Sequence, residues 1–187
     1  MKKIYESIIS KESILLLNEI NNSKIIRMNR DNDFYINDIY VKLVIFTSKG
    51  NIEIGVDIKY SKEYDEFTKI TVKKTKEEEI SINGKMEEVT MNQNIKNIYI
   101  YRDIVELSEN DVLVKDRGLI FELEEYSMGY FVSDYSPSTF ERIDFLETDM
   151  VCNIYPTIKE YKNAFEDKII SYKRERIYIK DLVKDFK

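Results

Sequence analysis

The chain has 187 residues, of which 43% are hydrophobic and 34% are charged, and its formal net charge is −6. It contains no histidine and a single cysteine, Cys152. Catalysis by Ser-His-Asp or Cys-His groups, zinc sites rich in histidine or cysteine, and an intrachain disulfide are therefore excluded. The length and the even spread of apolar residues favour one domain over residues 1–187.

Charged residues interrupt the first apolar segment before it reaches the length of a signal-peptide core, and no run approaches ~20 uncharged apolar residues. We therefore expect no export signal and no membrane-spanning segment. A reducing cytoplasm is the simplest location for a chain with one cysteine.

The first predicted element is a helix over residues 4–21, where apolar residues recur at near-helical spacing. A polar connection over residues 29–38 follows. The stretch from Ile39 to Tyr60 predicts a β-hairpin, because two alternating apolar runs flank a turn at residues 48–51 whose Gly50-Asn51 pair supplies positive φ. The apolar positions predict a core face and the alternate positions a polar face. The core face comprises Ile39, Val41, Leu43, Ile45, Ile52, Ile54, Val56 and Ile58.

Further strands are predicted through the middle of the chain. Residues 68–75 alternate in the manner of a third strand, and Asn83-Gly84 is a strong signal for a two-residue hairpin. A polar connection over residues 92–97 leads into a strand over residues 98–107, whose apolar residues on both faces indicate a central position. Three short runs then predict an antiparallel meander, with strands at residues 112–114, 119–123 and 130–132 and glycine-ended reversals at residues 115–118 and 126–129.

The C-terminal part is predicted to be largely helical. Ser138 and Glu141 have the spacing of a capping box, which favours a short helix to about residue 147, although a strand suits Ile143 and Phe145 equally well. A longer helix is predicted from Pro156 to Tyr172. A basic break at residues 173–176 then separates it from a last helix over residues 179–186. This order of elements predicts an α+β fold with a mainly antiparallel sheet, curled or in two layers, an N-terminal helix and C-terminal helices.

Negative charge is concentrated between Asp103 and Asp149, which hold 13 acidic and three basic residues, a net charge of −10. Such a segment repels phosphate backbones, so we expect no nucleic-acid binding, and it attracts basic proteins. Tyrosines within it suit an interface, because they offer broad apolar area and a polar tip. These features predict a non-catalytic interaction module, such as an immunity protein or a mobile-element inhibitor, that needs no cofactor. The candidate contact residues are Glu122, Glu124, Glu125, Tyr126, Tyr130, Asp134 and Tyr135.

An enzymatic alternative rests on Asp38 and on the triplet Asp57-Ile58-Lys59, which follow a predicted helix carrying Glu19. This arrangement resembles the PD-(D/E)xK nucleases. The resemblance implies that Asp38 and Asp57 hold Mg²⁺, that Lys59 is the catalytic lysine and that Glu19 is a helix carboxylate. The competing interpretation is cross-strand charge pairing, such as Lys42 with Asp57, on a solvated strand face.

A third possibility is a small-ligand-binding β-barrel with a pocket lined by Tyr and Phe. The remaining acidic runs, such as residues 77–79 and 87–88, lack the spacing of a calcium loop and are better explained as solvated edges. The oligomeric state stays open.

Overall fold

The computed structural model describes residues 3–31, 43–60, 66–76, 86–107, 111–132, 139–143 and 169–186. In these ranges the chain is mostly β-sheet, with one helix between the first two strands and two short helical turns at the end. The strands are β1 (Lys3–Ser7), β2 (Lys24–Asp31), β3 (Leu43–Thr47), β4 (Gly50–Tyr60), β5 (Glu66–Lys74), β6 (Met86–Glu106), β7 (Asp111–Leu123), β8 (Ser127–Phe131), β9 (Thr139–Ile143) and β10 (Ser171–Tyr178). The helices are α1 (Lys11–Ile20), α4 (Ile179–Leu182) and the 3₁₀ helix η2 (Val183–Phe186).

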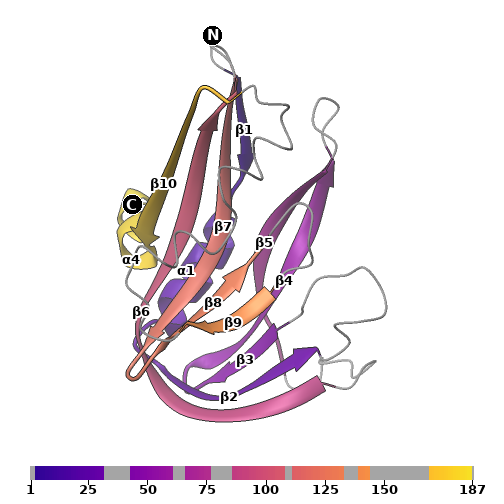
Figure 1. Ribbon diagram of the computed structural model, residues 1–187. Helices are drawn as coiled ribbons and strands as arrows, with labels where there is room; N and C mark the ends of the chain where they lie inside the picture. Colours follow the sequence, from indigo (N-terminus) through magenta and orange to yellow (C-terminus); the bar gives the residue numbers. More distant parts are fainter. Residues whose placement is uncertain are drawn as a thin grey trace.

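The strands form one mixed sheet with the order β5-β4-β3-β2-β6-β7-β8-β9. Strand β6 is the centre: its first half pairs with β2, its second half pairs with β10 on the same side, and β7 occupies its other edge. Strand β1 adds to the start of β7 in the parallel direction, while the other pairings are antiparallel. Figure 1 shows that the sheet curls until it nearly closes, with β6 sweeping from the base of the molecule to its upper end.

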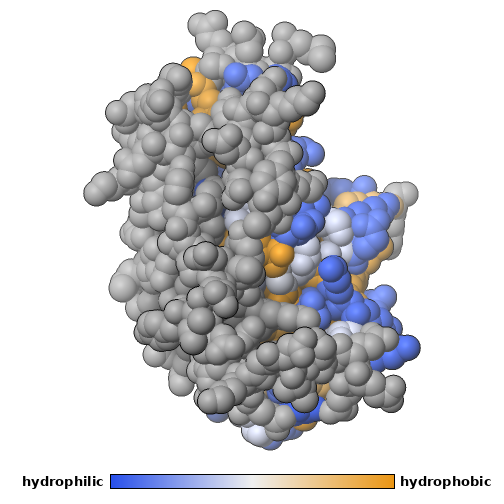
Figure 2. Space-filling view, turned by 90° about the vertical axis from the view of Figure 1, so that its right-hand side faces the viewer, coloured by the Kyte–Doolittle hydropathy of each residue, from blue (hydrophilic) through white to orange (hydrophobic). Residues whose placement is uncertain are grey.

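The main core fills the concave side of the curled sheet. Its buried residues come from α1, from β2 to β8 and from α4, and they include Leu17, Ile25, Ile45, Ile98 and Phe121. Apolar area removed from water on this scale is the principal favourable term in folding. Figure 2 shows hydrophilic and hydrophobic residues side by side on the described surface of the side that faces right in Figure 1. None of the described helices is long and apolar enough to cross a membrane.

Two serines, one on β1 and one on α1, form hydrogen bonds to the backbone of the edge strand β5. The Ser7 hydroxyl donates to the carbonyl of Thr68 at 2.8 Å. The Ser13 hydroxyl donates to the carbonyl of Val72 at 2.9 Å and accepts from its N–H at 3.3 Å. Side chains from β1 and α1 thus satisfy backbone groups of Thr68 and Val72 at the edge of β5, where the described part of the sheet has no further strand.

The predicted N-terminal helix is only partly correct. Residues 11–20 form α1, whose N-cap is Ser10, but residues 3–7 form β1 because they pair with β7. The Ser10 hydroxyl accepts from the N–H of Ser13 at 3.2 Å, which is the standard role of an N-cap serine. Strand β2 was not predicted: it begins after the predicted helix, which ended at residue 21, and runs into the first residues of the polar connection predicted over residues 29–38.

The hairpin of β3 and β4 is confirmed, with Leu43 opposite Ile54 and Thr47 opposite Gly50. Gly50 has φ of 142°, a value that favours glycine. Four residues of the predicted core face, Leu43, Ile45, Ile52 and Ile54, are buried, and Val56 packs against the core. The opposite face of β3 is not polar, however, because Val44 and Phe46 are buried as well, and the Arg27 guanidinium lies 3.7 Å from the Phe46 ring centroid. Strand β5 also agrees with its prediction.

Two predicted interruptions in the middle of the chain are wrong. Residues 92–97 are not a connection but belong to β6, which is continuous over 21 residues and absorbs an irregularity at Asn92, where φ is 54°. Residues 115–118 are not a reversal but the middle of β7, so the first two runs of the predicted meander are one strand. A reversal between the last two runs is present but lies earlier than predicted: the chain turns at residues 124–126, and residues 127–129 already belong to β8.

The C-terminal elements differ most from expectation. Residues 139–143 form β9, which agrees with the strand alternative for that segment. The predicted basic break and the end of the preceding helix form β10, because residues 171–178 pair along β6. Helical structure at residues 179–186 is confirmed. The turn predicted at Asn83-Gly84 and residues 156–168 of the predicted helix lie outside the described residues.

Candidate functional site

The polar segment of β7 is buried. Lys115, Asp116 and Arg117 are each no more than 2% exposed. A β-bulge places them: Arg102 of β6 lies opposite Asp116 and Tyr101 lies opposite Gly118, so that Arg117 is the extra residue on β7. A bulge re-aims side chains at the point where it interrupts the ladder. The Lys115 amine donates to the Thr68 hydroxyl at 2.9 Å, across the seam between β7 and β5.

Asp116 is held by two donors from different parts of the fold. The Arg102 guanidinium forms a fork on it, with Nε to Oδ1 at 2.7 Å and Nη2 to Oδ2 at 3.1 Å. The backbone N–H of Ile9, in the link from β1 to α1, donates to Oδ2 at 2.8 Å. Burial raises the pKa of Asp116, and the hydrogen bonds from Arg102 and Ile9 oppose that increase. Asp116 thereby anchors the start of α1 to the sheet.

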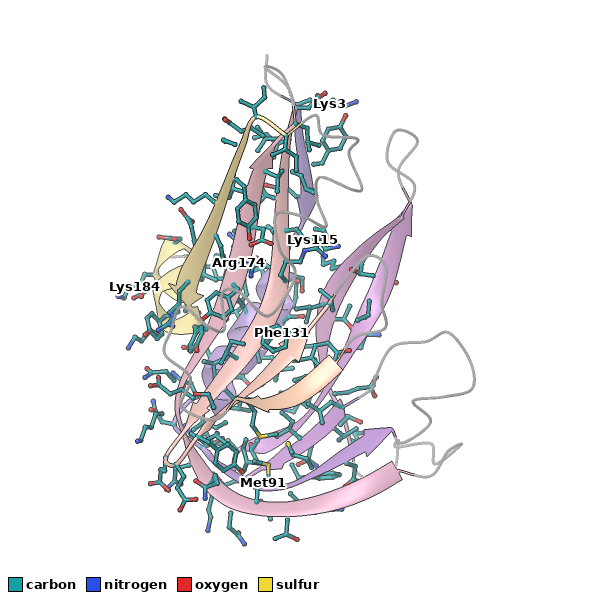
Figure 3. All side chains as sticks on the ribbon, in the orientation of Figure 1. Lys3, Met91, Lys115, Phe131, Arg174 and Lys184 are labelled. Carbon is teal, nitrogen blue, oxygen red and sulfur yellow. The ribbon has the colours of Figure 1, made fainter. Side chains whose placement is uncertain are left out.

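Asp103 has a similar role for β10. Arg174 donates to both carboxylate oxygens of Asp103, at 2.6 and 2.7 Å, and the Tyr172 hydroxyl donates at 3.2 Å. Arg117 Nε lies 3.8 Å from the same carboxylate. Asp103 is fully buried, and Arg117 and Arg174 have side chains that are only 3% and 6% exposed. We call Arg102, Asp103, Asp116, Arg117 and Arg174 the buried charge cluster. Figure 3 shows Arg174 on β10, Phe131 on β8 and Lys115 on β7.

The chemistry of the buried charge cluster is structural. Its carboxylates accept charge-assisted hydrogen bonds from arginines, which remain protonated in proteins, so neither Asp103 nor Asp116 is placed as a proton acceptor for a substrate. Within the described part of the chain, no group of three His, Cys, Asp or Glu side chains could hold a metal ion. The bonds from arginine neutralise Asp103 and Asp116, two of the acidic residues of the segment from Asp103 to Asp149, inside the protein.

The acidic turn, formed by Glu122, Glu124 and Glu125, stands at the end of β7 where the chain reverses into β8. Glu124 and Glu125 are exposed and Glu122 is half-buried. Asparagine amides on β6 hold two of the carboxylates: Asn97 Nδ2 donates to Glu122 Oε2 at 2.7 Å, and Asn94 Nδ2 donates to Glu124 Oε1 at 3.0 Å.

The backbone beneath the acidic turn is tied to the core. Leu123 is buried, and its N–H donates to the carbonyl of Tyr126 at 2.9 Å. Lys96 Nζ donates to the carbonyl of Glu124 at 3.1 Å. The carboxylates of the acidic turn are therefore displayed on an ordered support.

The other predicted contact residues divide into two groups. Tyr126 is half-buried and packs against the main core beside the acidic turn. Tyr130 is fully buried in that core, so its side chain does not lie on the surface with the carboxylates. Asp134 and Tyr135 are not among the described residues. The sequence pattern did not show that Tyr130 faces the core and not the surface.

A basic flank, Arg176 and Lys180, lies next to the acidic turn. Arg176 on β10 is exposed, its guanidinium lies 4.6 Å from the Tyr99 ring centroid, and Nη2 donates to the Tyr101 hydroxyl at 3.2 Å. Lys180 on α4 is exposed, and its amine lies 5.1 Å from the Tyr178 ring centroid. Tyr99 and Tyr178 pack edge to face, with centroids 5.6 Å apart.

The structure describes only some of the residues of the nuclease alternative. Asp57 is exposed and lies opposite Lys69 of β5, and Glu19 is exposed on α1. Asp38 and Lys42 lie outside the described ranges, as does the side chain of Lys59. Asp57 thus stands on a solvated strand face with a lysine on the neighbouring strand, a position typical of cross-strand charge pairing.

Sequence reasoning missed the buried charge cluster and the basic flank. The sequence did contain one sign of the long strand β7: apolar runs at strand spacing stand on both sides of residues 115–118, as they would in a continuous strand.

We compared the chain with protein-family models, with curated proteins and with solved structures, and none of them matches it.

Proposed function

We propose that this chain is a non-catalytic interaction module, of the immunity-protein or mobile-element-inhibitor kind, that binds a basic protein through its acidic turn. The observation that carries the proposal is the fixing of Glu122 and Glu124 by asparagine amides. Each amide occupies one carboxylate oxygen, and no described residue donates to the other oxygen. Two carboxylates are thus oriented in advance and still able to accept hydrogen bonds.

Preorganisation of the Glu122 and Glu124 side chains lowers the free-energy cost of binding a partner. Immobilising a flexible side chain at an interface costs about 0.5–1.5 kcal/mol, and part of that cost is already met for these two glutamates when the chain folds. Bonds from lysine or arginine to a carboxylate are charge-assisted and stronger than neutral ones. The acidic turn therefore suits the side chains of a basic partner better than an equal number of free surface glutamates.

The charge distribution supports the same proposal. Asp103 and Asp116 are neutralised in the interior, so the negative charge that a partner meets in the described part of β7 and β8 is concentrated at the acidic turn. Association would be steered by this charge, and its rate would fall as salt is added. We also infer a cytoplasmic location, since the chain has a single cysteine.

The test is a matched pair of charge reversals. Glu124→Lys with Glu125→Lys reverses the acidic turn. Glu19→Lys with Asp185→Lys makes the same change in net charge at exposed positions elsewhere. Proteins retained from a bacterial lysate at low salt by the immobilised chain would be identified by mass spectrometry. We expect a basic protein to be retained by the parent and by the Glu19/Asp185 variant, and to be lost from the Glu124/Glu125 variant.

Equal retention by both variants would show that net charge alone attracts the protein, and would refute the proposal. Asn94→Ala gives a finer check, because it frees the Glu124 carboxylate without changing any charge. We expect this variant to release the partner faster than the parent. Unchanged dissociation would show that fixing the carboxylate is irrelevant to binding.

A further inference from the structure

The guanidinium of Arg176 is exposed and fixed. It stacks on Tyr99, bonds the hydroxyl of Tyr101 and lies 5.8 Å from that ring's centroid. Burial raises the pKa of Tyr99, so this phenol is neutral at physiological pH and gives Arg176 no counter-charge. Among the described residues, Arg176 makes no ion pair. It bonds the Tyr101 and Tyr178 side chains, and its other N–H groups can still bind an anion. Stacking on an aromatic face is a geometry that arginine adopts readily, and it leaves the donor edge accessible.

Lys180 connects the basic flank to the acidic turn through one asparagine. Its amine donates to Asn97 Oδ1 at 3.3 Å, and the Nδ2 group of the same amide donates to Glu122 Oε2 at 2.7 Å. Lys180 and Glu122 form no direct ion pair, and each of them bonds the Asn97 amide. Here the Asn97 amide lies between them, so both charges are kept and both are oriented.

The result is a surface with two zones of opposite charge that meet at Asn97. The acidic zone is the acidic turn, and the basic zone is Arg176 and Lys180 on either side of the Tyr99 and Tyr178 rings. Figure 1 places β10 and α4 next to β6, the strand that carries Asn97. A partner that was only basic would be attracted by one zone and repelled by the other.

We propose that the basic flank is the second half of the partner-binding surface, and that the partner segment carries a carboxylate within a few residues of its basic cluster. This inference rests on the proposed function, since it assumes that the acidic turn receives basic side chains. The partner's carboxylate binds the free edge of Arg176 and the amine of Lys180, while its basic side chains bind Glu122 and Glu124. Complementary charge zones of this kind set orientation and exclude partners of the wrong pattern.

Two labelled peptides test the inference against the full chain. One is hexalysine, and the other is hexalysine extended by three glutamates. Fluorescence anisotropy at low salt gives the dissociation constant of each. General attraction to a chain of net charge −6 predicts that the extended peptide binds more weakly, because its positive charge is lower. Our inference predicts the opposite, a gain on the order of threefold from ion pairs with the basic flank.

Variants assign that gain to the basic flank. Arg176→Gln with Lys180→Gln is expected to abolish the preference for the extended peptide and to leave hexalysine binding equal or tighter. Lys73→Gln with Lys74→Gln changes the charge equally at exposed positions on β5 and is expected to keep the preference. Arg176→Lys, which retains the charge but not the planar fork, should reduce the gain. Circular dichroism would verify that each variant is folded.

The outcomes separate the two proposals. If the parent binds hexalysine but prefers it to the extended peptide, or if the Arg176/Lys180 variant keeps the parent's preference, the inference about the basic flank is overturned and the proposed function stands. If hexalysine does not bind, or binds equally to the Glu124/Glu125 variant, the proposed function fails and the inference fails with it.

Discussion

Replacing Asp103 by alanine should destabilise the protein more than almost any other single polar substitution in the described chain. Asp103 is fully buried and accepts two charge-assisted bonds from Arg174. Arg117 and the Tyr172 hydroxyl lie on the same carboxylate. Its removal leaves two buried guanidinium groups without the carboxylate that compensates their charge.

Breaking a buried ion pair by removing one partner costs about 3–5 kcal/mol. For a domain of this size, each kcal/mol corresponds to a change in Tm of roughly 2–4 °C, so Asp103→Ala should lower Tm by about 6–20 °C. Because Arg174 is on β10 and Asp103 on β6, the loss falls on the pairing of these two strands. Protection of the β10 amides from hydrogen exchange should decrease more than that of β3 or β4.

Urea unfolding followed by far-ultraviolet circular dichroism measures the change in free energy. Asp181→Ala is the matched control, because it removes an exposed carboxylate that is paired with Lys184 at 2.7 Å. An exposed pair contributes little, so this control should unfold at the same urea concentration as the parent. Asp103→Leu combined with Arg174→Met replaces both partners with apolar side chains and should recover part of the loss. If Asp103→Ala unfolds at the same urea concentration as the control, the carboxylate is not buried among cations and the reasoning fails.

Three further outcomes are expected. Gly129→Ala should lower the free energy of unfolding by about 1–3 kcal/mol in urea titrations, because an added Cβ would overlap the Phe131 ring. Ser13→Ala should cost about 1–3 kcal/mol and speed hydrogen exchange at the Val72 amide, since the hydroxyl bonds both the N–H and the carbonyl of that residue. Stability should fall as pH rises above about 10, the ordinary tyrosine pKa, because burial raises the pKa of Tyr99 in the folded state. Tyr99→Phe should make urea midpoints measured between pH 9 and 11 less dependent on pH.

Each of these outcomes has a control or a contrary result. Gly55→Ala adds a Cβ that would meet only Thr71 Oγ1 at 3.7 Å, so equal losses at Gly55 and Gly129 would contradict the packing argument. Ser171→Ala removes an exposed hydroxyl that bonds Glu106 at 2.7 Å, and it should leave the urea midpoint unchanged. An alkaline loss of stability that is the same with and without Tyr99 would assign the pH dependence to other groups.

The candidate site was predictable only in its exposed part. Glu124 and Glu125 were expected at the surface, and they are there, because charged residues in a tight reversal have no neighbours to exclude water. Asp103 and Asp116 belong to the same negative segment but are buried. Their partners, Arg174 and Arg102, lie 71 and 14 residues away in the chain, at distances where no local pattern records a pairing.

The fold shows the same division. Local patterns were enough to predict the hairpin of β3 and β4, strand β5 and the helical end of the chain, because each shows a local period or a turn residue that one conformation satisfies best. Long-range pairing makes residues 3–7 and 171–178 strands, because their backbone groups find partners in β7 and β6. Long-range pairing also makes residues 115–118 part of β7 and not a reversal. Lysine, aspartate and arginine next to glycine favour a turn in isolation, and here hydrogen bonds and ion pairs from distant segments compensate their burial inside a sheet.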